Sequence, residues 1–257
     1  MDLSGRLALA HSIADTAGAL ALGFFEQRGA LTVEHKGLQD LVSKADRDVE
    51  TLIRTRIAEA FPQDTILGEE HGGTPGESVW CIDPIDGTTN FLRGLPHWAI
   101  SIAFVHQNVP QLGVIWGPRL DERFAAQRGK GATLNGQPIH VSKVDRLDQA
   151  VVAFGSSRKT AQGPYLAALG SLLSAGIEYR RLGSATHNLC QVACGRLEGY
   201  YEGKLSPWDA AAGLLLVTEA GGRTNDYFAN DGMRSGNAVL ATNGLLYDAL
   251  SQATGVK

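Results

Sequence analysis

The sequence predicts a fold of the α+β class in which helices and sheets lie in layers. Apolar residues recur at helical spacing over residues 2–27 and again over 45–60. Short apolar runs rich in β-forming residues follow over 79–142, and strands then alternate with helices over 150–222. Elements that are apolar on one side bury that side against another element, so these runs are expected to stack.

The first helix is expected to be an amphipathic helix of a globular protein. Its apolar run is interrupted by Arg6, His11 and Asp15, and no clear cleavage site follows. A signal peptide and a membrane span of about 20 apolar residues are therefore both disfavoured. We expect a cytoplasmic protein with no membrane association.

A polar stretch over residues 31–44 is expected to be a strand or loop that leads into the second helix. Ser43 is placed to cap that helix, because a serine hydroxyl accepts hydrogen bonds from the N–H groups of a first turn. The helix ends before Pro62, which cannot continue it. A short strand and a glycine turn are predicted next, by DTILGEEHGG.

The middle of the chain predicts a largely antiparallel sheet. Residues 99–107 and 109–118 form two apolar runs with a short turn between them. The segment 122–142 contains Asn135-Gly136, a strong signal for a hairpin.

The polar segment 143–150 is the one domain boundary that composition suggests. It divides the chain into an N-terminal α+β half, residues 1–142, and a C-terminal α/β half, residues 143–257. In the second half, Pro207 is expected to begin a helix, since its fixed φ suits a first helical turn. We expect the two halves to form one compact unit.

Composition excludes some classes of function. The chain has 257 residues, of which 44% are hydrophobic and 19% charged, and this is ordinary globular usage. Its net charge of −4 gives no basic excess, so there is no direct signal for nucleic-acid binding. Three cysteines without CxxC spacing predict neither a disulfide framework nor a structural zinc site.

The segment DPIDGTTNF carries the most chemical information. An apolar strand delivers Asp83 to a turn fixed by the next residue, a proline, and Asp86 follows three residues on. Two buried carboxylates that face one point repel each other, and a hard cation such as Mg²⁺ relieves that repulsion. Gly87 and Thr88 then resemble a helix start, where N–H groups hold phosphate. An Asx turn followed by a helix cap is the alternative.

Two further acidic residues strengthen the metal interpretation. Glu69 lies in a GEE segment at the end of a predicted short strand, where the alternative is an acid in a solvated loop. Asp209 follows Pro207 at a predicted helix N-terminus, where a carboxylate is stabilised in any case. Capping is therefore the alternative role for Asp209.

Taken together, these segments resemble the inositol monophosphatase family, within the lithium-sensitive, Mg²⁺-dependent phosphomonoesterases. The resemblance rests on SKAD at 43–46, GEE at 68–70, DPIDGTTNF at 83–91 and PWDAAAGLLLVTEAGG at 207–222. It extends between them, over nearly the whole chain. It implies a layered αβαβα sandwich, like that of fructose-1,6-bisphosphatase, and a homodimer.

The resemblance implies two or three Mg²⁺ ions in each active site. The implied metal ligands are Glu69, Asp83, the backbone carbonyl of Ile85, Asp86 and Asp209. The implied catalytic residues are Thr88 and Asp46, which would position and deprotonate the attacking water, together with Glu69. A two-metal site of this kind needs no covalent phosphoenzyme.

The resemblance also implies the residues that bind the substrate, a small phosphate monoester. Backbone N–H groups of Gly87 and Thr88 would hold the phosphate. The alcohol side would be lined by Gly183, Ser184, Ala185 and Glu202, with Lys36 near the mouth.

The preferred substrate implied by the resemblance is inositol 1-phosphate. Histidinol phosphate is the alternative, because Glu202 would pair equally well with an ammonium group, and fructose 1,6-bisphosphate and nucleotide 3′-phosphates are more remote. The loop at 203–206 departs from the family pattern, since it carries Lys204 and no histidine. A second alternative is a protein that binds RNA or the transcription machinery, with incidental phosphatase activity.

Overall fold

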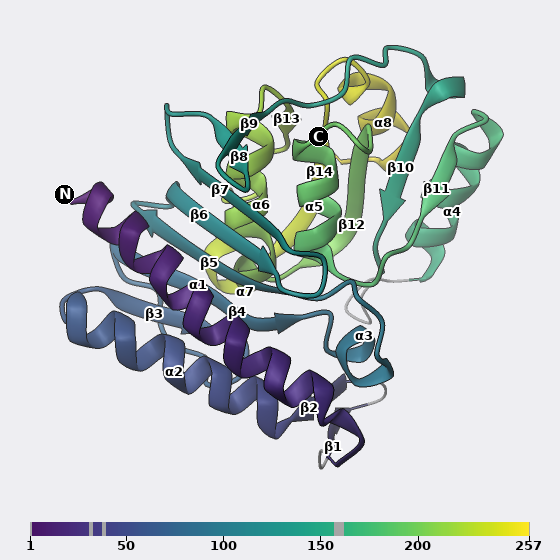
Figure 1. Cartoon of the computed structure of the whole chain (residues 1–257). Helices are drawn as coiled ribbons and strands as arrows, with labels where there is room; N and C mark the ends of the chain where they lie inside the picture. Colours follow the sequence, from purple (N-terminus) through teal and green to yellow (C-terminus); the bar gives the residue numbers. More distant parts are fainter. Residues whose placement is uncertain (1, 31–32, 38–39, 157–161, 257) are drawn as a thin grey trace.

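Five layers of helix and sheet are stacked in the order α, β, α, β, α (Figure 1), which confirms the layered sandwich implied by the resemblance. The computed structural model describes residues 2–30, 33–37, 40–156 and 162–256. The helices that make up the layers are α1 (Leu3–Glu26) with α2 (Lys44–Ala60), α5 (Ala185–Ala193) with α6 (Pro207–Glu219), and α4 (Gln162–Ser174) with α8 (Tyr247–Thr254).

The first sheet has seven strands and comes from the N-terminal half. In spatial order they are β3 (Thr65–Gly68), β4 (Ser78–Asp86), β5 (Ala99–His106), β6 (Val109–Gly117), β7 (Glu122–Gln127), β8 (Ala132–Leu134) and β9 (Gln137–Ile139). Among the described strands of this sheet, only the β3–β4 pair is parallel. Asn135 and Gly136 join β8 to β9 with positive φ angles of 49° and 78°, as the hairpin signal predicted.

The second sheet has five strands and comes from the C-terminal half. In spatial order they are β11 (Glu178–Arg180), β10 (Val151–Phe154), β12 (Gly199–Leu205), β14 (Asn237–Thr242) and β13 (Arg223–Thr224). Shorter elements lie outside the layers: β1 (Val33–Gly37), β2 (Asp40–Ser43), α3 (Thr88–Arg93) and α7 (Gly232–Ser235).

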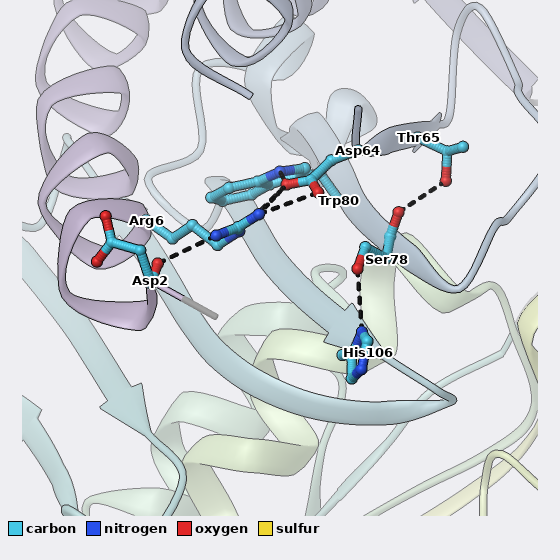
Figure 2. Close-up of polar contacts among 7 residues, drawn as sticks. All are labelled: Asp2, Arg6, Asp64, Thr65, Ser78, Trp80 and His106. Carbon is cyan, nitrogen blue, oxygen red and sulfur yellow. Dashed lines mark hydrogen bonds and ion pairs between the residues drawn. The ribbon is translucent and has the colours of Figure 1, made fainter. Parts of the chain in front are cut away.

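Among the described residues, α1 is the one helix long and apolar enough to cross a membrane by length and composition. In the structure it lies along one face of the seven-stranded sheet beside α2 (Figure 1). Arg6 of this helix makes an ion pair with Asp64, which also accepts a hydrogen bond from Trp80 of β4 (Figure 2). The apolar residues of α1 therefore pack in the core between this helix and the sheet.

The cap predicted for α2 is present. The Ser43 hydroxyl accepts from Ala45 N at 3.1 Å, and the Asp46 carboxylate accepts from Ser43 N at 2.8 Å. This reciprocal capping box fixes the Asp46 side chain at the start of the helix. The helix ends at Ala60, and Phe61 is its C-cap, directly before the proline, as predicted.

The prediction of a tight turn at residues 83–86 is wrong, because these residues belong to a strand. β4 continues to Asp86, and the irregularity is a bulge in its pairing with β5, between Asp83–Ser101 and Asp86–Ala99. The Asp83 carboxylate accepts from Ile85 N at 2.9 Å within the bulge. Since Pro84 has no N–H for the ladder, the strand bulges there and resumes two residues later.

The central layer brings the two halves together. α6 belongs to the second half, yet it packs on β4, β5 and β6 of the first sheet. Gly113 of β6 permits this approach, because a Cβ atom there would lie 2.8 Å from Ala212 Cα. The N-terminus of α6, which carries Asp209, is thereby placed against β4.

Candidate active site

Three aspartates converge where β4 meets the N-terminus of α6. Ligand oxygens of Asp83, Asp86 and Asp209 all lie within 4.8 Å of one another. Asp83 and Asp86 are buried, at 1% and 8% exposure, and Asp209 is half-buried. These three aspartates are predicted as metal ligands from the sequence, and the structure brings them to one point.

Electrostatics at this point favour a cation. Burial raises the pKa of Asp83 well above its usual 3.8, and the charges of Glu69, Asp209 and Asp86 raise it further. Burial also raises the pKa of Asp86, although hydrogen bonds from Ser184 and Thr186 oppose the rise. Buried carboxylates grouped in this way hold either protons or a metal ion. The donors are all oxygen, which fits a hard cation such as Mg²⁺.

Thr88 and Asp46 lie next to this cluster and touch each other. The Thr88 hydroxyl is 3.2 Å from Asp46 Oδ1 and 3.1 Å from the carbonyl oxygen of Ile85. Its single proton can serve only one of these acceptors at a time. Asp46 is fully buried, and burial raises the pKa of its carboxyl, opposed by hydrogen bonds from Ser43.

Gly87 is the N-cap of α3, with its backbone in the left-handed region at φ 90°. A Cβ atom at this position would lie 2.9 Å from the carbonyl oxygen of His97 and 3.2 Å from Ser184 Cβ. Both the positive φ and the close approach require glycine here. The N–H groups of Gly87 and Thr88 therefore lie at the start of a helical turn, beside the acidic cluster.

Asn90 joins this turn to the second half of the chain. Its side-chain amide donates to the carbonyl oxygens of His97, at 2.6 Å, and Leu182, at 2.8 Å. The second of these bonds spans 92 residues of sequence. It places Gly183, which has a φ of 81°, against the Asn90 side chain.

Ser184 and Ala185, which were predicted to line the alcohol side of the substrate, lie against Asp86. Asp86 Oδ2 accepts from the Ser184 hydroxyl at 2.5 Å, and Oδ1 accepts from Ala185 N at 3.3 Å. The next residue, Thr186, donates to Oδ2 through its hydroxyl at 2.5 Å and its N–H at 2.7 Å. The start of α5 thus surrounds one metal-ligand candidate with donors.

Glu202 is buried in β12 at 7% exposure, and Tyr200 on the same face donates its hydroxyl to Glu202 Oε2 at 2.5 Å. Burial raises the pKa of Glu202 from 4.5 to about 7, the Tyr200 hydrogen bond opposes this, and Asp209 and Asp86 add to the rise. The negative charges of Asp209 and Asp86 show that Glu202 lies near the acidic cluster.

Glu50 of α2 holds the loop that carries Glu69 through hydrogen bonds to its backbone. Glu50 is fully buried and accepts from Glu70 N at 2.7 Å, from His71 N at 3.1 Å and from Arg54 Nε at 2.7 Å. Arg54 also donates to the carbonyl oxygen of Gly72. Glu69 is half-buried, and its charge acts on Asp83, so this clamp sets a residue close to the cluster.

One predicted site residue is placed only by its backbone. Lys36 lies in β1, and its side chain falls outside the described part of the chain. Within the described part of the chain, four residues that contact the predicted site residues or the loops that carry them were not predicted as functional: Glu50, Asn90, Thr186 and Tyr200. Of these, Glu50 carries a sequence signal, since it lies four residues after Asp46 on the apolar side of its helix, near Ile53.

Comparisons with known proteins cover nearly the whole chain. The model of the inositol monophosphatase family matches residues 2–255. "Nus factor SuhB" of Escherichia coli (strain K12) is 40% identical over 239 residues, which are 91% of this chain and 90% of that protein. Among solved structures, the extragenic suppressor protein suhB of Bartonella henselae is 36% identical with a TM-score of 0.91, over 98% of this chain and 99% of that one.

A second solved structure is similar over the same extent. The inositol monophosphatase of Anabaena (Nostoc) sp. PCC 7120 is 35% identical with a TM-score of 0.85, over 98% of this chain and 96% of that one. The relatives thus carry two kinds of name, inositol monophosphatase and Nus factor.

Proposed function

The chain belongs to the inositol monophosphatase family, and on that premise we propose that it is a Mg²⁺-dependent phosphomonoesterase whose preferred substrate is inositol 1-phosphate. The observation that carries the proposal is the convergence of Asp83, Asp86 and Asp209 beside the helical turn at Gly87. A buried acidic cluster next to N–H groups suits a cation that faces a phosphate.

The metal ligands of the proposal are carboxylates and one carbonyl. Asp83, Asp86, Asp209, Glu69 and the carbonyl of Ile85 would hold two or three Mg²⁺ ions. When bound, Mg²⁺ supplies activation of water at neutral pH and neutralises charge that develops on the phosphate and the leaving oxygen.

Thr88 and Asp46 would orient the attacking water and take its proton. Asp46 Oδ2 is held by the N–H and hydroxyl of Ser43, at 2.8 and 2.7 Å, so Oδ1 faces the Thr88 hydroxyl. A water that donates to Thr88 Oγ1 would pass its proton on as Thr88 donates to Asp46 Oδ1. The oxygen of that water would then form a bond to phosphorus, the ester P–O bond would break, and the leaving alkoxide would take a proton from solvent water.

The remaining residues would bind the two ends of the substrate. N–H groups of Gly87 and Thr88 would hold the phosphate oxygens. Glu202, fixed at Oε2 by Tyr200, would accept hydrogen bonds from ring hydroxyls at Oε1. Further contacts on the alcohol side of the substrate would come from Gly183, Ser184 and Ala185, with Lys36 near the mouth of the site.

The test is phosphate release from four esters with Mg²⁺ and with EDTA: inositol 1-phosphate, histidinol phosphate, fructose 1,6-bisphosphate and 3′-phosphoadenosine 5′-phosphate. We expect the highest kcat/KM on inositol 1-phosphate, loss of activity in EDTA and inhibition by lithium. Release at the no-enzyme background on all four would overturn the proposal. A higher kcat/KM on histidinol phosphate would replace the substrate and leave the reaction class standing.

Variants separate the two parts of the proposed site. Asp86→Asn should lower kcat by about 10³-fold, because it removes a charged ligand of the cation that would neutralise the transition state. Glu202→Gln should change substrate preference and leave the Mg²⁺ requirement near that of the wild type. A Glu202→Gln variant with an altered Mg²⁺ requirement and unchanged preference would show that Glu202 does not bind the alcohol.

A second candidate function follows from the relatives that are named Nus factors. We propose that the chain, as a cytoplasmic homodimer, also binds the transcription machinery. Tagged wild-type and Asp86→Asn proteins would be tested for binding to purified RNA polymerase. Dimerisation would be tested by comparing the size of each protein in solution with a series of size standards. Binding by both proteins supports a role independent of catalysis, and binding by neither removes this candidate.

A further inference from the structure

We propose that Ser184 and Thr186 are positioning residues for the metal centre: their hydroxyls hold one oxygen of Asp86 at the start of α5, so that the other oxygen faces the cation. This inference rests on the proposed function, and it gives Thr186 a role that the sequence did not predict. It also gives Ser184 a role toward a metal ligand in addition to the one expected toward substrate.

The hydrogen bonds to Asp86 are unequal on its two oxygens. Oδ2 accepts from the hydroxyls of Ser184 and Thr186, both at 2.5 Å, and from Thr186 N at 2.7 Å. Oδ1 has one longer contact, 3.3 Å from Ala185 N. Ser184 and Thr186 are 2% and 0% exposed, so water does not compete for these donors. Oδ2 is therefore saturated with donors, whereas Oδ1 keeps the capacity to bind a cation.

The direction of each hydroxyl proton is fixed by its other contacts. Ser184 is the N-cap of α5, and its Oγ accepts from His187 N at 3.2 Å. Its single proton is therefore the one donated to Asp86 Oδ2. The Thr186 hydroxyl lies 3.5 Å from that of Ser184 and 2.5 Å from Asp86, so its proton also goes to the carboxylate.

This arrangement matters because an aspartate carboxylate turns easily. The last torsion of the Asp side chain is broad, so packing alone does not set which oxygen points at a metal ion. Asp86 ends β4 in the first sheet, whereas its donors come from α5, 98 to 100 residues later. The bonds thus tie the orientation of a ligand to the packing of the central layer on the first sheet.

The experiment measures Mg²⁺ binding directly, by titration calorimetry of the whole chain freed of metal with EDTA. Thr186→Val keeps the shape and the N–H and removes the hydroxyl, whereas Thr186→Ser keeps the hydroxyl. We expect Thr186→Val to weaken Mg²⁺ binding about 10- to 100-fold, as loss of a hydrogen bond to a metal ligand typically does. Thr186→Ser should restore most of the affinity.

A matched control removes another buried threonine hydroxyl. Thr242 of β14 is also 0% exposed, and its hydroxyl accepts from Gly244 N at 3.0 Å. Thr242→Val should lower the melting temperature without changing Mg²⁺ affinity. Ser184→Ala provides a second variant at the site if Thr186→Val does not fold, and it too should weaken Mg²⁺ binding.

The outcomes separate this inference from the proposed function. Wild-type affinity in Thr186→Val, equal weakening in Thr186→Ser, or no Mg²⁺ binding by the wild type would each overturn the inference. A wild type that binds Mg²⁺ with this pattern but hydrolyses no ester would overturn the proposed function alone. Activity of Thr186→Val that recovers at high Mg²⁺, with little change in kcat, would support both.

Discussion

Aspartate side chains buried on the two sides of β4 have opposite electrostatic surroundings. On the face toward α1 and α2, Asp64 is enclosed by donors (Figure 2). Two nitrogens of Arg6 contact its carboxylate at 2.8 to 3.1 Å, and Trp80 Nε1 donates to it at 3.0 Å. The Asp64 side chain is 6% exposed. Each charged group here is paired with an opposite charge or with a hydrogen-bond donor. These contacts link α1 to the sheet.

On the face toward α6, Asp83 is buried among other acids. Its pKa is raised well above the usual value by burial and then by Glu69, Asp209 and Asp86. Glu50 resembles Asp64 instead, since it is fully buried and bound by Arg54 and two backbone N–H groups. Burial of an acid therefore does not by itself mark a functional site. The sign of its neighbours does, because acids among acids need a cation.

The largest expected effect is on activity, at Asp83. Asp83→Asn should lower kcat by at least about 10³-fold, since it removes a charged ligand from the cluster. In EDTA the same variant should be no less stable than the wild type, because it removes repulsion from Glu69, Asp86 and Asp209. Phosphate release and urea unfolding measure the two quantities. A large loss of stability in EDTA would place Asp83 in the same class as Asp64.

The opposite pattern is expected at Asp64. Asp64→Asn should lower the free energy of unfolding by about 3 kcal/mol, because it leaves the half-buried guanidinium of Arg6 without its counter-charge. Activity per folded molecule should stay near the wild-type value. The control is the double variant Arg6→Met with Asp64→Leu, which removes both charges and should regain much of the stability. Loss of kcat in folded Asp64→Asn would break the comparison.

Local signals explain which parts of the fold were predictable. Ser43, the Asn135-Gly136 pair and Pro207 each act within a few residues, so the cap, the hairpin and the start of α6 follow from sequence. β14 and α8 follow the last predicted helix and were not predicted. The bulge in β4 was also missed, because it depends on pairing with β5 rather than on Pro84 alone.

The candidate site divides in the same way. Asp83, Asp86, Glu69 and Asp209 stand in motifs that a reader of the sequence can find. Thr186 cannot be found in this way, because its contact with Asp86 exists only after α5 packs on the first sheet. Residues that orient a ligand thus depend on tertiary packing, whereas the ligands themselves are marked by their spacing.

Removal of metal sharpens the contrast between the two faces through pH. Raised pKa values at Asp83, Asp86 and Asp46 mean that the folded, metal-free protein favours protonated carboxyls. Their contribution to stability is therefore present at low pH and lost as pH rises through the raised values. Mg²⁺ binds the ionised forms, so its stabilisation should grow with pH, to about 2.7 kcal/mol at 100 times its Kd.

Thermal unfolding in Mg²⁺ and in EDTA across a pH series measures this difference. The Asp83→Asn variant is the control, because a weakened cluster should reduce the stabilisation by Mg²⁺ at every pH. A gap between the two melting curves that stays constant with pH would show that metal binding does not depend on ionisation of these acids.

Glu202 lies between the two extremes and gives the smallest expected effect. It has a neutral donor, Tyr200, where Asp64 has a guanidinium, and burial raises its pKa from 4.5 to about 7. A raised pKa means that its contribution to stability is full below about pH 4.5 and is lost as pH rises to about 7. Glutamine mimics the protonated form at all pH values. In EDTA, the stability advantage of Glu202→Gln over the wild type should therefore grow by on the order of 2 kcal/mol in free energy of unfolding as the pH rises from about 5.5 to about 8.

Denaturant unfolding of both proteins at the two pH values measures this gain, and Tyr200→Phe provides the opposite change. Without the Tyr200 hydroxyl the carboxylate loses the donor that favours its charged form, so the loss of stability with pH should be larger than in the wild type. A Glu202→Gln variant whose stability parallels the wild type at both pH values would mean that Glu202 is compensated like Asp64. A single neutral hydroxyl would then be enough to hold a buried charge beside the acidic cluster.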